Sequence, residues 1–130
     1  MKYEMKPEFY TGIEFIDTQH ARLFEIANET YELMINEFTP DKYDYILDLL
    51  NELKEYTKYH FTAEEEYMES IQYKKMFSQK VDHHAFVSKL EEMNPEYIDE
   101  NQSQAIFDIL EFLNTWLIEH IFEKDILIGH

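Results

Sequence analysis

Polar side chains interrupt each of four apolar stripes that recur at helical spacing along this sequence, and they are its best candidates for chemistry. Glu64 follows His60 at i+4, so the two side chains share one face of a helix. Neutral imidazole and carboxylate oxygen suit iron, manganese or zinc, and a shared metal would satisfy buried polar groups that otherwise cost roughly 1–3 kcal/mol each. We therefore predict one metal centre formed by His20, His60, Glu64, His83 and His120, with Gln79 on the same helix face as His83.

Four amphipathic helices joined by short connections must position these residues. Asp17 or Thr18 is suited to cap the first helix, and Asp41, which follows the helix-ending Pro40, is suited to cap the second. The Asn-Pro pair at 94–95 is expected to close the third helix. The apolar stripes cover residues 23–34, 46–67, 76–90 and 106–121.

The arrangement of these helices is predicted to be an all-α, antiparallel up-down-up-down four-helix bundle with an extended N-terminal arm that ends near Gly12. Only two glycines and three prolines occur, too few for the many turns of a sheet-rich domain. The length favours a single domain over residues 1–130. In such a bundle His20, His60 and His120 come close together at one end.

The charge and composition of the chain exclude several classes of function. It has 11 basic and 28 acidic residues, a net charge of −17, which disfavours binding to nucleic acid or to anionic membranes. It has no cysteine, which excludes disulfides, thiolate metal sites and cysteine nucleophiles. No stretch reads as a signal peptide or a membrane span, so a cytoplasmic protein is expected. The charge favours a monomer or a weak homo-oligomer.

Four sequence motifs together carry a resemblance to a known family. They read GIEFIDTQHARLF, HFTAEEEYM, HHAFVSKL and WLIEHIFEKD, and their order and spacing resemble those of the hemerythrins, in particular the single-domain bacterial ones, over roughly residues 10–126. The resemblance implies a non-haem di-iron centre that binds dioxygen reversibly between four helices. By motif it assigns His20 and His60 to one iron, His83 and His120 to the other, and Glu64 and Asp125 as bridging carboxylates.

Asp125 is the ligand that helical periodicity does not favour. It follows His120 by five residues, a step of about 140° around an ideal α-helix, whereas Glu123 at i+3 faces the same way as His120. A local widening of the helix, of the π-bulge kind found at functional sites, would bring Asp125 round. We predict that Asp125 is the ligand and that Glu123 lies on a solvated face.

Gln79 is the one departure from the family pattern. The third helix of the family carries HxxxH, and in the register set by Phe86 the second histidine is His83 and the first position is Gln79. The carbonyl oxygen of Gln79 can ligate iron weakly, or its amide can hydrogen-bond to a water or ligand on that iron. His84, about 100° round the helix from His83, is expected to face the surface or to support a ligand.

The resemblance favours dioxygen binding for storage, transport or sensing. An enzyme is therefore the less expected outcome. Such a site needs an apolar pocket, and Phe24 and Leu117 are placed to line it, with Trp116 at its flank, although all three also read as ordinary core. The alternative is a di-iron enzyme that acts on peroxide, dioxygen or nitric oxide through the position opened by Gln79. A bundle without a di-iron centre that binds a partner is the third hypothesis.

Overall fold

The chain is entirely helical over the residues that the computed structural model describes, which are 6–36 and 38–129. None of these residues lies in a β-strand, so the all-α prediction is confirmed. The elements are a short 3₁₀ turn (Pro7–Phe9), α1 (Glu14–Ile35), α2 (Tyr43–Ser70), α3 (Met76–Glu91), α4 (Pro95–Glu100), α5 (Gln102–His120), a π-helical segment (Ile121–Asp125) and α6 (Ile126–Ile128).

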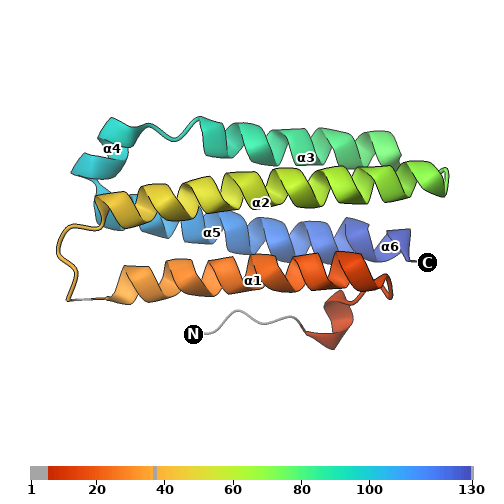
Figure 1. The fold of residues 1–130 in the computed structure, drawn as a ribbon, viewed down its shortest axis with the longest axis horizontal. Coiled ribbons are helices and arrows are strands. Elements are labelled where there is room, and N and C mark those ends of the chain that lie inside the picture. The colour runs from red at the N-terminus through yellow and green to blue at the C-terminus, as the bar shows by residue number, and fades with distance from the viewer. Residues whose placement is uncertain (1–5, 37, 130) are drawn as a thin grey trace.

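The four long helices lie along one another (Figure 1). In that view α1 and α3 run in one direction, and α2 and α5 run in the other. α1 contacts both α2 and α5, and α2 contacts α3. The short α4 lies where α3 turns into α5, and the connection between α2 and α3 lies at the opposite end, the end where α6 lies. As a result, the beginnings of α1 and α3 meet the later parts of α2 and α5.

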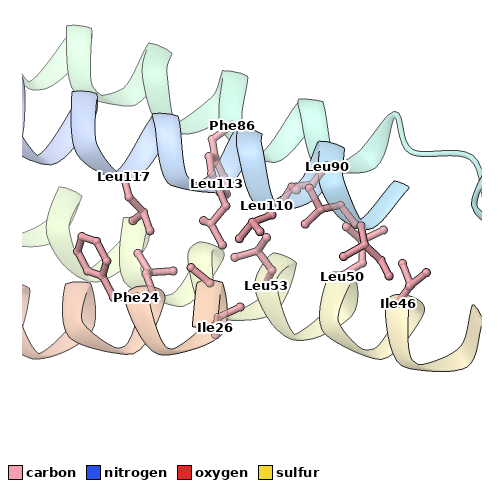
Figure 2. Close-up of a cluster of buried hydrophobic side chains, with 14 of the residues drawn as sticks. Phe24, Ile26, Ile46, Leu50, Leu53, Phe86, Leu90, Leu110, Leu113 and Leu117 are labelled. Carbon is pink, nitrogen blue, oxygen red and sulfur yellow. The ribbon is translucent and has the colours of Figure 1, made fainter. Parts of the chain in front are cut away.

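A large apolar cluster fills much of the space between the long helices (Figure 2), and Ile16, Met68 and Ile128 form a second, smaller cluster. Leu53 of α2, Phe86 of α3 and Leu113 of α5 are each at most 1% exposed. Full burial of one such side chain contributes roughly 1.5–3 kcal/mol to folding. Phe24 and Leu117 face each other at one end of this cluster, on helices α1 and α5.

The start of α1 differs from the predicted cap. The helix begins at Glu14, so neither Asp17 nor Thr18 is its N-cap. The Asp17 carboxylate instead accepts hydrogen bonds from the amide and the hydroxyl of Thr11, both at 2.8 Å, and from the amide of Gly12 at 3.1 Å. Gly12 has a φ of +87°, which glycine adopts without strain. The turn at Gly12 therefore lets the chain fold back onto the carboxylate.

The segment before Gly12 contains a 3₁₀ turn where the sequence predicted an extended arm. Pro7–Phe9 form a 3₁₀ turn, which a proline at its first position favours. Phe9 is buried and stacks on Phe24 of α1, with ring centroids 5.8 Å apart. The turn is thus held against the bundle by an aromatic contact, and residues 1–5 of the predicted arm lie outside the described residues.

The two other predicted helix boundaries fare differently. The N-cap of α2 is Lys42 rather than the predicted Asp41, although Asp41 accepts a hydrogen bond from the first amide of the helix, that of Tyr43, at 3.1 Å. By contrast, α3 ends at Glu91, and the Asn-Pro pair at 94–95 begins α4, which was not predicted. Asparagine favours the N-cap and proline the first helical position, so this pair starts a helix as readily as it ends one.

Within residues 6–36 and 38–129, no helix combines the length and the apolarity needed to cross a bilayer.

Candidate metal centre

Seven polar side chains meet inside the bundle, and all are between 0% and 5% exposed. They include each metal-ligating residue that the sequence predicted, together with Gln79. The seven come from every long helix and from the π segment: His20 from α1, His60 and Glu64 from α2, Gln79 and His83 from α3, His120 from α5, and Asp125.

Glu64 lies between histidines of three helices. Its Oε2 is 3.2 Å from Nε2 of His60 and 3.6 Å from Nε2 of His20. Its Oε1 is 3.0 Å from Nε2 of His83. The two oxygens of one carboxylate therefore face opposite halves of the site, as a bridging ligand must.

Asp125 makes the corresponding link through the other two elements. Its Oδ2 is 3.0 Å from Nε2 of His20, and its Oδ1 is 3.0 Å from Nε2 of His120. The backbone from Ile121 to Asp125 is π-helical, so the predicted local widening is confirmed. This widening turns Asp125 inward, and it is 0% exposed, while Glu123 lies at the surface as predicted.

The donor atoms of this site fit two metal ions. One set comprises His20, His60, Glu64 and Asp125, the other comprises Glu64, His83, His120 and Asp125, and the donor atoms of each set lie within 4.8 Å of one another. Within the described residues the four Nε2 atoms and both Glu64 oxygens are buried and have no hydrogen-bond partner. Uncompensated burial of so many polar atoms would be costly. Two ions that share both carboxylates would satisfy them.

The electrostatics of the site maintain its carboxylates as anions. Burial raises the pKa of Glu64, but contacts with His20, His60 and His83 hold that pKa well below its usual range. The pKa of Asp125 is also lowered, because His120 and His20 outweigh burial and the Glu64 charge. Burial lowers the pKa of His20, but Asp125 and Glu64 raise it to about 9. Protons and metal ions therefore compete for the same imidazole nitrogens.

Comparison with known families agrees with this donor set. The sequence model described as "Hemerythrin HHE cation binding domain" matches residues 11–129. The chain belongs to the hemerythrin family. The resemblance seen in the sequence motifs is thereby confirmed.

Several bacterial hemerythrins are similar to this chain over most of its length. The Bacteriohemerythrin of Clostridium acetobutylicum is 52% identical over 120 residues, which cover 92% of this chain and 93% of that protein. The Bacteriohemerythrin of Pseudomonas aeruginosa (strain LESB58) is 29% identical over 116 residues, which cover 88% and 71%. That of Methylococcus capsulatus is 26% identical over 122 residues, which cover 94% and 89%.

Three residues that sequence reasoning missed orient the histidines of this hemerythrin site. Nδ1 of His60 donates to Oε1 of Gln19 at 2.6 Å, and Nδ1 of His83 donates to Oε2 of Glu65 at 2.9 Å. Asp82 lies beside His120, with Oδ2 3.5 Å from Nδ1, in an ion-pair contact rather than a hydrogen bond, and the same oxygen pairs with Lys124. A proton kept on Nδ1 leaves the Nε2 lone pair free for a metal. Each of the three is adjacent in sequence to a site residue, which was the available signal.

Aromatic rings enclose the half of the site that contains His83 and His120. Phe61 stacks on the His83 ring at 4.0 Å between centroids, with an interplanar angle of 4°. Trp116 stacks on the His120 ring at 4.2 Å and 13°. These stacking contacts help to fix the planes of the two imidazole rings.

Gln79 reaches the centre without a hydrogen bond to a histidine. Its Nε2 donates to Oδ1 of Asp125 at 3.1 Å, and its Oε1 is buried and has no partner within the described residues. His84 is exposed, in agreement with the surface-facing expectation. The predicted pocket residues Phe24 and Leu117 are 4% and 0% exposed within the apolar cluster.

Proposed function

We propose that this hemerythrin-family chain is a non-haem di-iron protein that binds dioxygen reversibly, for storage, delivery or sensing. The observation that supports it most strongly is the pair of donor sets that share Glu64 and Asp125. His20 and His60 would hold one iron, and His83 and His120 the other. Two imidazoles and two carboxylate oxygens leave coordination positions open on each ion, a condition for binding an exogenous ligand. The bound irons would supply the redox chemistry of reversible dioxygen binding.

The protein's own contribution is to position the donors and to exclude water. Gln19 and Glu65 hold the protons of His60 and His83 on Nδ1, so Nε2 of both faces the centre. Phe24 and Leu117 would form the apolar wall of the dioxygen pocket, because both are buried where the apolar cluster ends. A dry, apolar wall favours a neutral diatomic gas over water and slows the loss of reactive ligands to solvent.

The proposal extends to the setting of the site. It assumes one hemerythrin domain over residues 1–130, folded as an antiparallel up-down-up-down four-helix bundle with an N-terminal arm. Its ligand is a small gas rather than nucleic acid or a membrane. With a net charge of −17 the chain would act in the cytoplasm as a monomer or a weak homo-oligomer.

A di-iron enzyme acting on peroxide, dioxygen or nitric oxide is the second candidate. The observation that favours it is Gln79, whose buried carbonyl oxygen has no partner within the described residues. A neutral carboxamide is a weaker ligand than imidazole, so the iron beside it would be more open to substrate. An open coordination position is what distinguishes catalytic metal sites from saturated ones.

The experiment that tests the proposal is iron analysis followed by gas cycling. The protein is purified without oxygen, its iron content is measured, and its visible spectrum is recorded under dioxygen and then under argon. We expect two irons per chain and a spectrum that returns to its starting form. Irreversible spectral change would favour the enzyme, and a chain without iron would refute both functions. Glu64→Ala should lose iron, while Glu66→Ala, at an exposed site on the same helix, should keep it.

A further inference from the structure

A cavity of about 420 Å³ has Gln79 in its wall. The rest of the wall comes from the connection between α2 and α3, from the start of α3, and from the π segment with α6. Gln79 belongs both to this cavity and to the metal centre, because its Nε2 donates to Oδ1 of Asp125 at 3.1 Å. One side chain therefore links the cavity wall to Asp125, one of the two carboxylates that the donor sets share.

The segment around the start of α3, which contributes to the cavity wall, is rich in lysine although the protein is acidic. Residues 74–89 include four lysines and one aspartate, whereas the whole chain has 11 basic and 28 acidic residues. Lys75 and Lys124 line the cavity, together with Glu123. Lys124 pairs with Asp82 and donates to the Ser78 hydroxyl. Lys75 forms no ion pair within residues 6–36 and 38–129, so its ammonium is available to an anion.

The carboxamide of Gln79 can donate a hydrogen bond to an anion in the cavity. Its carboxamide has two N–H hydrogens, and Asp125 takes one of them, so the second remains for a ligand. An imidazole at this position would coordinate a metal through its own nitrogen. A neutral amide oxygen competes poorly with an anionic ligand for the same coordination position.

We propose that this cavity admits a small monovalent anion to the metal position formed by His83 and His120. The second N–H of Gln79 and the ammonium of Lys75 are the groups that attract and orient the anion. This hemerythrin-family centre then accepts exogenous ligands on both of its metals. The proposal rests on the di-iron site proposed above.

Azide binding to the iron-loaded, diferric protein tests the proposal. Isothermal titration calorimetry counts the azide ions bound, and iron analysis of the same sample counts the metal. We expect two azides per two irons in the unmodified protein. Gln79→His should remove one of them, because the imidazole occupies the position that the anion takes. A single azide per two irons in the unmodified protein would overturn the proposal, although the di-iron site would stand.

Lysine variants supply a test that does not depend on how Gln79→His folds. Lys75→Gln should weaken the binding of one of the two azides by about fivefold, which is the effect expected from losing one partly exposed charge contact. The affinity for the other azide should not change. Lys80→Gln is the matched control, since it removes the same charge from the same segment but does not line the cavity. Equal weakening by the two variants would overturn the proposal, because only general charge would then matter. A chain that binds no iron would refute the proposed function and this proposal together.

Discussion

Raising the pH from 7 to about 9.5 should destabilise the protein once its metal has been removed by a chelator. The reason is the His20 imidazole, whose pKa rises from 6.5 to about 9 beside Asp125 and Glu64, despite burial. The folded protein therefore binds a proton that the unfolded chain has already lost. This stabilisation is fully present below pH 6.5, and it is lost as the pH rises through 9.

The expected size of the effect follows from this pKa. A rise from 6.5 to about 9 corresponds to about 3 kcal/mol of folding free energy in full, of which about 2 kcal/mol is lost between pH 7 and 9.5. His83 adds to the effect, because its pKa is raised by Glu64 and Glu65 in spite of burial. Burial lowers the pKa of His60, so its titration is confined to lower pH. For a domain of this size, about 2 kcal/mol lowers the melting temperature by roughly 5–10 °C.

Urea unfolding of the chelated protein at pH 7 and 9.5 measures the difference directly. His20→Gln is the control: it should unfold more easily at pH 7 and show a smaller change between the two pH values, since it lacks the titrating group. An unfolding free energy that is equal at both pH values in the unmodified protein would refute the reasoning. It would mean that the buried carboxylates do not hold a proton on His20.

Other substitutions test the ligands, their supports and the core. His60→Ala and Glu64→Ala should each leave fewer than two irons per chain by elemental analysis, and iron content equal to that of the Glu66→Ala control in either would contradict the assignment. Gln19→Ala should weaken iron binding by about 10–100-fold in a chelator competition, because Nδ1 of His60 loses its acceptor at 2.6 Å; unchanged affinity would show that the hydrogen bond does not matter. Leu113→Ala should lower the free energy of unfolding by about 2–5 kcal/mol in urea, since the side chain is fully buried; a loss below about 1 kcal/mol would indicate that the core closes around it.

Most of the site could be predicted from the sequence because its residues contradict the pattern around them. A histidine or glutamate on an apolar stripe is conspicuous, since burial without a partner is costly, and His20, His60 and Glu64 were found in this way. The same periodicity predicted the long helices that carry them. Their order along the chain then required the polar positions to meet when consecutive helices reverse direction.

Asp125 shows where periodicity by itself is not enough. On an ideal α-helix it lies about 140° from His120, so only the resemblance to the hemerythrins favoured it over Glu123. The π-helical backbone from Ile121 to Asp125 forms in the tertiary structure, where the inward carboxylate lies within 3.0 Å of both His20 and His120. Local sequence did not reveal which turn would widen.

Only the tertiary structure shows which polar residues contact the Nδ1 atoms of the site histidines. The residues concerned are Gln19, Glu65 and Asp82. In the sequence, nothing distinguishes them from the many other acidic and amide side chains of this chain. Each of their partners is a histidine on a different helix, 41 residues away in sequence for Gln19 and 18 residues away for Glu65. Helix periodicity determines which face a residue occupies. Packing across the bundle decides which other helix that face contacts and at what position along the bundle axis. The same amphipathic pattern is compatible with more than one neighbour, so the sequence does not settle this.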